Sequence, residues 1–239
     1  MQQKETQITL TQLYNVLKQL YNSQIVSKYD KKYQINMLWI NQLEETVRTY
    51  YQRSNQIDWK SFGEGQRIVL KAGSLAELDP IWGDVFYTLG NLSGSADIHT
   101  YNSDVYHIIG MYATEKNFYS STKYNFHFVV QRQNTLNDYG IGLYKQVGIT
   151  DIIYAKHEML FGTPGRVINI MGPYIIDFLM PEQLEHYFNY HFTTIQDMSQ
   201  FHQSQFNALF DLPVQCKLTV IHDAKLAEQY RKVLMGETK

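Results

Sequence analysis

Two ionisable residues stand inside apolar, strand-like segments of the chain. His107 lies in the segment 105–112 (VYHIIGMY) and Asp177 in the segment 174–180 (YIIDFLM). A histidine or carboxylate that points into an apolar interior has a perturbed pKa, which suits it to acid–base chemistry. The alternative is that each side chain faces solvent, because successive residues of a strand point to opposite sides. The sequence leaves both interpretations open.

The remaining histidines do not have the spacing of metal ligands. His186 and His191 are five residues apart in a segment with helical periodicity, so they lie about 140° apart around the helix axis. His191 and His202 share a face of that helix, but about 16 Å of rise separates them. Neither pair can bind one ion. We therefore expect no metal site and no cofactor.

Two glycine-containing segments fall short of known nucleotide-binding patterns. Gly94 and Ser95, followed by Ser103 and Asp104, resemble the start of a nucleotidyltransferase site. Tyr106, however, stands where the second metal-binding carboxylate is required. The segment 162–166 (GTPGR) lacks the lysine and hydroxyl of a P-loop. We interpret both segments as loops.

The elements that position these residues fall into three parts. Residues 1–62 contain two helical apolar stripes joined by a polar segment at 27–32, which predicts a helical hairpin with a loop between its helices. Residues 63–181 contain short apolar runs punctuated by glycine, which predicts a sheet. Residues 182–239 contain a helical stripe, an alternating strand and a final helix capped by Asp223.

The middle part is expected to form the core of the protein. Its predicted strands are the segments 67–71, 105–112, 124–130, 165–171 and 174–180. Short connections favour antiparallel pairing. A doubly wound sheet is disfavoured, because the predicted strands do not alternate regularly with long helices. The fold class is therefore α+β, with a twisted, mostly antiparallel sheet and helices on one face. An N-terminal helical hairpin and a C-terminal helix–strand–helix extension flank this core.

Composition restricts the partners and the compartment. The 239 residues carry 21 basic and 23 acidic side chains, and no stretch approaches the roughly 18 apolar residues of a membrane helix. Without a broad basic surface, we expect neither nucleic acid nor a membrane as partner. The single Cys216 cannot form an internal disulfide, and the first residues show no apolar signal segment. We expect a cytoplasmic protein.

Four segments of the chain share their order and character with one known fold. These are 72–78 (AGSLAEL), 105–118 (VYHIIGMYATEKNF), 135–144 (TLNDYGIGLY) and 166–181 (RVINIMGPYIIDFLMP). They resemble, in turn, the helix start, central hairpin, crossover and closing hairpin of the chorismate lyase fold. The ligand-sensing domain of one class of bacterial repressors shares that fold. The resemblance covers slightly under half of the chain.

The resemblance implies a small enclosed site between the sheet and flap-like loops. In the lyase, this site eliminates pyruvate from chorismate and leaves a bound 4-hydroxybenzoate. By position, the family's arginine falls on His107, its backbone amide on Ile141 and its glutamate on Asp177. An imidazole lacks the permanent charge of arginine, and aspartate is one methylene shorter than glutamate. Whether the chain is a divergent lyase or only binds a ligand stays open.

These considerations give a leading hypothesis and a rival. The leading hypothesis is a protein that binds a small carboxylate or aromatic acid. His107 and Asp177 are then the catalytic candidates, and Ile141, Arg166 and His127 the ligand contacts. The rival is a structural or partner-binding protein that lacks a ligand site and forms a homo-oligomer through its terminal helices. Contiguous exposed apolar side chains on those helices would favour the rival.

Overall fold

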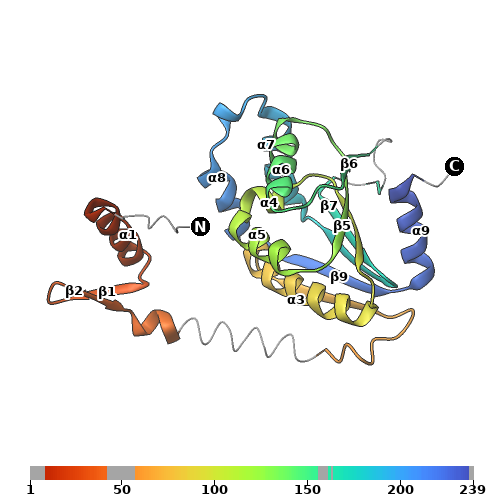
Figure 1. Ribbon diagram of the computed structural model, residues 1–239, viewed down its shortest axis with the longest axis horizontal. Coiled ribbons are helices and arrows are strands. Elements are labelled where there is room, and N and C mark those ends of the chain that lie inside the picture. The colour runs from red at the N-terminus through yellow and green to blue at the C-terminus, as the bar shows by residue number, and fades with distance from the viewer. Residues whose placement is uncertain (1–8, 42–56, 156–160, 163, 237–239) are drawn as a thin grey trace, which may run out of the picture. The chain divides into compact units, whose positions relative to one another are not determined.

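The computed structural model describes residues 9–41, 57–155, 161–162 and 164–236. The chain divides into two compact units, residues 1–57 and residues 58–239 (Figure 1). The sequence pattern predicts this boundary near residue 62.

The N-terminal unit is a helix followed by a β-hairpin. Its elements are α1 (Leu10–Asn22), β1 (Val26–Tyr29) and β2 (Lys32–Ile35). Thr9 begins α1 with a capping box, because its side chain accepts from the Gln12 amide while the Gln12 side chain accepts from the Thr9 amide. A further helical segment covers residues 37–41, and the remainder of the second predicted stripe lies outside the described residues.

The loop expected at residues 27–32 is instead this β-hairpin. The strands pair antiparallel with Val26 opposite Ile35 and Tyr29 opposite Lys32. Asp30 and Lys31 form the two-residue turn with φ of 47° and 60°. Two left-handed residues are what a type I′ turn requires, and its twist matches that of the paired strands. The polar strands of this hairpin carry too weak an apolar pattern to be recognised from sequence.

The second unit is built on one seven-stranded sheet with the order β3-β9-β8-β7-β4-β5-β6. Its strands are β3 (Arg67–Ala72), β4 (Asp97–Asn102), β5 (Asn125–Val130), β6 (Ile152–Tyr154), β7 (Arg166–Met171), β8 (Tyr174–Leu179) and β9 (Cys216–His222). Neighbours from β3 to β4 pair antiparallel, whereas β4, β5 and β6 are parallel. The predicted α+β class with a mostly antiparallel sheet is confirmed.

The segment 182–239 completes this sheet. Strand β9 lies between β3 and β8, with Val220 opposite both Ile68 and Ile176. The C-terminal segment therefore supplies a central strand, in contrast to the appended extension that the sequence suggested.

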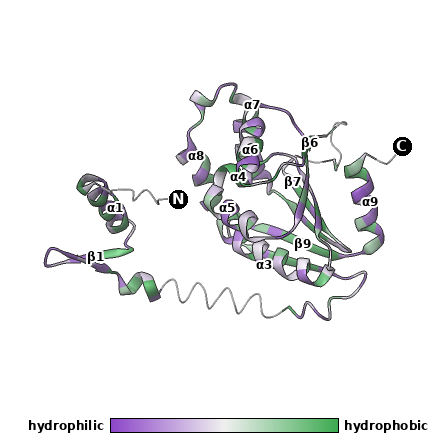
Figure 2. Cartoon of the chain, viewed as in Figure 1, coloured by the Kyte–Doolittle hydropathy of each residue, from purple (hydrophilic) through white to green (hydrophobic). Residues whose placement is uncertain are grey.

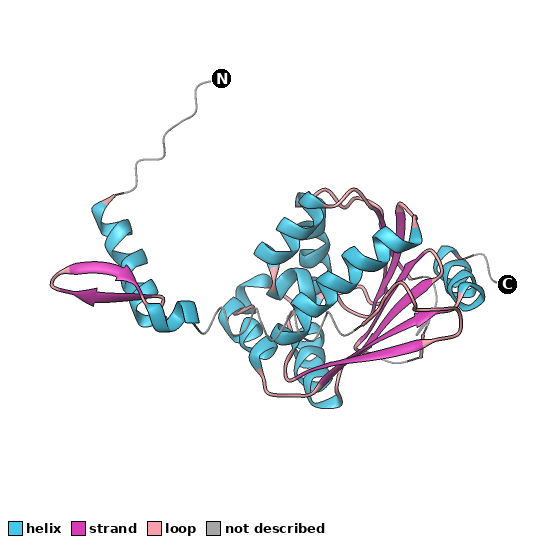
Figure 3. Ribbon diagram, turned by 90° about the horizontal axis from the view of Figure 1, so that it is seen from below, coloured by secondary structure: helices cyan, strands magenta, loops and turns pink. Residues whose placement is uncertain are grey.

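Helices cover both faces of the sheet, unequally (Figure 3). They are α3 (Leu75–Ser93), α4 (Tyr106–Gly110), α5 (Tyr112–Ser121), α6 (Thr135–Gln146), α7 (Glu182–Thr194), α8 (Gln203–Ala208) and α9 (Ala224–Met235), with short 3₁₀ turns at Met198–Gln200 and Leu209–Asp211. Helices α3 to α8 enclose the larger core on one face. Helix α9 packs alone on the opposite face, where Ala227 and Leu234 meet Ile168, Ile170 and Ile175. None of the helices in the described part of the chain is both long and apolar enough to cross a membrane.

Residues 105–112, predicted as a strand, form helix α4 and the start of α5. Tyr106, Ile108 and Ile109 are nonetheless buried, as the apolar pattern requires. The helical conformation is fixed by tertiary packing, because Gly140 of α6 lets that helix approach α4 closely. A Cβ on Gly140 would lie 2.4 Å from Val105 Cγ2 and 3.2 Å from Ile109 Cγ1. Packing here overrides the strand preference of the local sequence.

Candidate functional site

The structure places the two catalytic candidates on opposite faces of the sheet. Asp177 lies between Ile176 and Phe178, which both join the core beneath α3 to α8, so the Asp177 side chain points to the α9 face. His107, in α4, stands within that larger core and contacts the rings of Trp82 and Phe210. The two side chains do not converge on a common pocket.

Asp177 is held by another predicted site residue, Arg166. The Arg166 guanidinium donates to both carboxylate oxygens, from Nε at 3.0 Å and from Nη2 at 2.7 Å. Its Nη1 donates to the Phe161 carbonyl at 3.2 Å. The fork geometry satisfies both groups. This pair therefore links β7 to β8, and the Arg166 guanidinium is not free to bind a ligand carboxylate.

The remaining predicted contacts lie elsewhere. Ile141 is inside helix α6, where backbone amides donate to carbonyls four residues earlier and are not free for a ligand. His127, on β5, stacks on His99 with 4.8 Å between ring centroids. Its Nδ1 lies 2.5 Å from an Asp151 carboxylate oxygen, and its Nε2 lies 3.6 Å from Asp97. His127 is thus part of a separate surface cluster.

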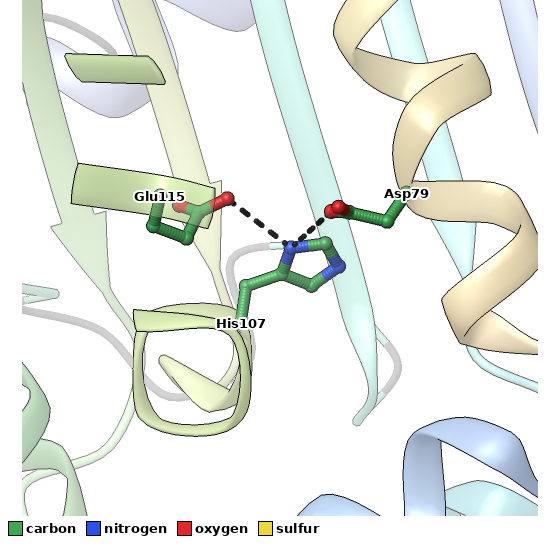
Figure 4. A group of neighbouring side chains, drawn as sticks. All are labelled: Asp79, His107 and Glu115. Atoms are coloured by element: carbon green, nitrogen blue, oxygen red, sulfur yellow. Dashed lines mark ion pairs between the residues drawn. The ribbon is translucent and has the colours of Figure 1, made fainter. Parts of the chain in front are cut away.

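His107 belongs to a group of three chemically competent side chains that sequence reasoning did not assemble. Figure 4 shows Asp79 of α3 and Glu115 of α5 directed toward its ring. The His107 Nδ1 lies 3.5 Å from Asp79 Oδ1 and 3.6 Å from Glu115 Oε1. One ligand atom from each residue lies within 4.8 Å of the others. We call Asp79, His107 and Glu115 the imidazole–carboxylate triad.

A break between α4 and α5 brings two members of the triad together. In a continuous helix, His107 and Glu115 would be separated by about 12 Å of rise. Met111 has φ −121° and ψ 34°, outside the helical region, so the chain changes direction between them. The triad cannot be recognised when residues 105–112 are assigned to a strand. Its recognition requires the helix break at Met111, and the sequence pattern does not indicate that break.

The triad is largely withdrawn from water. The exposed fractions of the Asp79, His107 and Glu115 side chains are 11, 17 and 12%. Burial raises the pKa of Asp79, because its charged form loses hydration, although the charge of His107 partly opposes this. Burial by itself would lower the pKa of His107, but Glu115 and Asp79 outweigh it, so the pKa of His107 is raised. Two acids therefore share one imidazole.

Aromatic side chains contact the His107 ring of the triad. The rings of Trp82 and Tyr106 each lie 5.1 Å from the His107 ring, measured between centroids. The indole N–H of Trp82 and the hydroxyl of Tyr106 are buried and have no hydrogen-bond partner among the described residues. Buried donors of this kind call for an explanation.

The N-terminal unit presents a different surface. Around α1, one side carries the side chains of Thr11, Asn15, Lys18, Gln19 and Asn22, which fall within about 100° of one another at 100° per residue. All five residues are exposed, and α1 has no carboxylate. The other side carries leucine and tyrosine. Figure 2 shows that α1 contains both hydrophobic and hydrophilic residues. Helix α1 therefore has one purely hydrogen-bonding face and one apolar face.

The β1–β2 hairpin carries positive charge. Lys28, Lys31 and Lys32 lie at or beside its turn, accompanied by one acid, Asp30. Cross-strand pairing puts Ser27 opposite Gln34 and Tyr29 opposite Lys32, which gives this face of the hairpin hydrogen-bonding groups throughout.

Comparison with known proteins gives a weak structural likeness and no family. No family model matches the chain, and no curated protein sequence matches it. The chain is similar to the structure of TrmBL2, described as an archaeal chromatin protein that shows a novel mode of DNA binding. The identity is 12% and the TM-score 0.36, over 96% of this chain and 82% of that chain. The chorismate lyase resemblance is not confirmed.

Two expectations are corrected by these findings. The leading hypothesis, a pocket for a small carboxylate or aromatic acid, is contradicted because its two central residues face opposite sides of the sheet. The exclusion of nucleic acid is withdrawn as well: the neighbour is described as showing a novel mode of DNA binding. At a TM-score of 0.36, the likeness assigns no partner to this chain.

Proposed function

We propose that the chain is a partner-binding protein whose N-terminal unit contacts duplex DNA through α1 and the β1–β2 hairpin. The observation that carries this proposal is the five-residue hydrogen-bonding face of α1, which is exposed and free of carboxylates. The proposal rests on these residues and not on the structural neighbour.

The helix suits readout of base edges. The major groove of B-DNA admits one α-helix or a two-stranded β-ribbon, and each base pair presents a distinct set of donors and acceptors there. Asn and Gln pair with adenine through two hydrogen bonds, and Lys donates to guanine. Asn15, Lys18 and Gln19 supply these groups from one side of α1. The deep, narrow major groove of duplex RNA would exclude the same helix.

The hairpin suits contact with phosphates. Lys31 and Lys32 are exposed at the turn, where long side chains can reach the DNA backbone. Phosphate contacts supply affinity and orientation, whereas base contacts supply sequence preference. The charge is local, because residues 1–60 carry eight basic and five acidic side chains in a chain of net charge −2. A whole-chain charge count therefore conceals this surface.

The test is binding of the full chain to a fluorescent duplex DNA, followed by anisotropy. The double variant Lys31→Gln/Lys32→Gln should weaken binding about tenfold, whatever the DNA sequence. The matched control is Lys123→Gln/Lys145→Gln, which removes the same charge from exposed positions of the second unit and should bind as wild type.

The helix is tested separately with Asn15→Ala and Gln19→Ala. Each should reduce discrimination between a selected sequence and its variants by about 1–3 kcal/mol. No binding of the full chain to duplex DNA, equal losses in both lysine pairs, or a preference for duplex RNA would each contradict the proposal.

A second candidate function, self-association, is favoured by the apolar face of α1. Leu10, Leu13, Tyr14 and Tyr21 are 74, 46, 63 and 51% exposed, and none of residues 9–41 is buried. A unit this small needs additional buried surface for stability. We infer that a second copy covers this face, because two identical apolar stripes can pack symmetrically.

Sedimentation of the full chain tests self-association. Wild type should sediment as a dimer and Leu13→Gln/Tyr14→Gln as a monomer, since glutamine preserves helix propensity but removes the apolar contacts. The control Thr11→Gln/Asn15→Gln alters the polar face and should remain dimeric. A monomeric wild type would refute this candidate.

A further inference from the structure

We propose that the imidazole–carboxylate triad of Asp79, His107 and Glu115 binds a divalent transition-metal ion, with Zn²⁺ as the best-matched ion. This site is independent of the N-terminal surface and of the proposed DNA contact. It joins three helices, α3, α4 and α5, on the larger-core face of the sheet.

The spacing of the donor atoms is the first argument. The His107 Nδ1 lies 3.5 and 3.6 Å from the two carboxylate oxygens, and neither contact is a hydrogen bond of normal length. Zinc binds nitrogen and oxygen at about 2.0–2.2 Å, so two tetrahedral ligands of one ion stand about 3.4 Å apart. These two separations are close to that ligand–ligand distance, and the two carboxylate oxygens lie within 4.8 Å of each other.

Charge is the second argument. In the described part of the chain, His107 is the ion-pair partner of both Asp79 and Glu115. Even when His107 is protonated, its single positive charge does not balance the two negative charges of these largely buried carboxylates. A dication that replaces the imidazole proton neutralises both acids, which burial otherwise penalises.

The surroundings supply the third argument. The Trp82 N–H and the Tyr106 hydroxyl are buried and have no partner among the described residues, and both rings contact the His107 ring. Metal sites with three protein ligands commonly keep a water in the fourth position. Unpaired buried donors on two rings that contact His107 show polar surroundings beside the triad, which a bound water requires.

The donor set selects the class of ion. One imidazole and two carboxylates suit Zn²⁺, Fe²⁺ or Mn²⁺, whereas Cu⁺ prefers thiolate and thioether ligands. Cys216 is buried and lies on β9, outside the triad. We therefore expect binding through nitrogen and oxygen alone.

The experiment is calorimetric titration of ZnCl₂ into the full chain after chelation and desalting. Wild type should bind one Zn²⁺ per chain. His107→Gln, Asp79→Asn and Glu115→Gln should each reduce the affinity about 100-fold or more, because each removes a ligand. Asp84→Asn, an exposed acid on the same helix as Asp79, and His186→Gln, an exposed histidine on α7, are matched controls and should bind as wild type.

A second measurement keeps the proposal testable if a variant folds poorly. Co²⁺ substituted into wild type should give visible absorption of a four- or five-coordinate site without the charge-transfer band of a thiolate ligand. Far-UV circular dichroism of the metal-free variants checks their folding. Absence of binding to both Zn²⁺ and Mn²⁺, wild-type affinity in the triad variants, or a thiolate band would overturn the proposal.

Discussion

Gly140 offers the sharpest test of how α4 is held in place. This glycine lies in α6 where the helix meets α4, and an added methyl would stand 2.4 Å from Val105 Cγ2. Val105 precedes α4, and Ile109, the other neighbour, lies two residues after His107. Gly140→Ala should therefore both destabilise the second unit and displace the helix that carries the triad's imidazole.

The magnitude follows from two opposed effects. Overpacking a tight core contact costs about 1–3 kcal/mol. Alanine in place of glycine within a helix returns about 1 kcal/mol. Gly142 in the same helix provides the control, because a Cβ there meets nothing within 4 Å. Gly142→Ala should gain about 0.5–1 kcal/mol. The two variants should therefore differ by about 1–3 kcal/mol, with Gly140→Ala the less stable.

Urea unfolding followed by circular dichroism measures this difference. In a unit of this size, 1 kcal/mol corresponds to about 2–4 °C in Tm, so thermal scans should agree. If Gly140→Ala proves as stable as Gly142→Ala, close packing of α6 on α4 does not determine the helical conformation of residues 105–110. That result would refute the reasoning.

Three further predictions concern groups outside the triad. Asp177→Asn should destabilise the second unit by about 1–3 kcal/mol in urea unfolding, because Arg166 loses a charged bidentate partner; an unchanged midpoint would contradict this. Burial raises the pKa of Cys216 to about 11, so a thiol reagent should label it only on unfolding, and rapid native labelling would contradict its burial. Burial and the charge of His127 lower the pKa of His99 in the folded state below its usual 6.5. The contribution of His99 to the free energy of unfolding is therefore fully present above pH 6.5 and is lost as the pH falls below 6.5. His99→Gln should flatten the decline in urea midpoint from about pH 7.5 to about pH 5, and an unaltered decline would exclude His99 as its source.

Most strands of the sheet are predicted from the sequence, for physical reasons. Strands β3, β5, β7, β8 and β9 are short apolar runs bounded by turn residues, which is the pattern of buried strands. The turn at Met171–Pro173 is also as predicted, with Gly172 at a φ of 52°. Asp223 caps α9 through the Leu226 amide, as its position suggested.

Other features escape sequence reasoning because distant contacts determine them. Strand β4 (DIHTYN) looks polar, yet Thr100 and Asn102 are buried in the sheet, and the Thr100 hydroxyl donates to Asn169. The segment 105–112 has the composition of a strand, but packing against α6 makes it helical. The triad then depends on that helix, on the break at Met111 and on Asp79 from α3. No spacing of residues in the sequence indicates it.

The salt dependence of DNA binding tests the proposed function most directly. For duplex DNA, the logarithm of the binding constant falls with the logarithm of salt concentration by about 0.9 for each phosphate contacted. Lys31→Gln/Lys32→Gln should therefore reduce the magnitude of that slope by about 2, while Lys123→Gln/Lys145→Gln leaves it at the wild-type value. A slope that is the same in wild type and the hairpin variant would contradict the assignment of the N-terminal unit as a DNA contact.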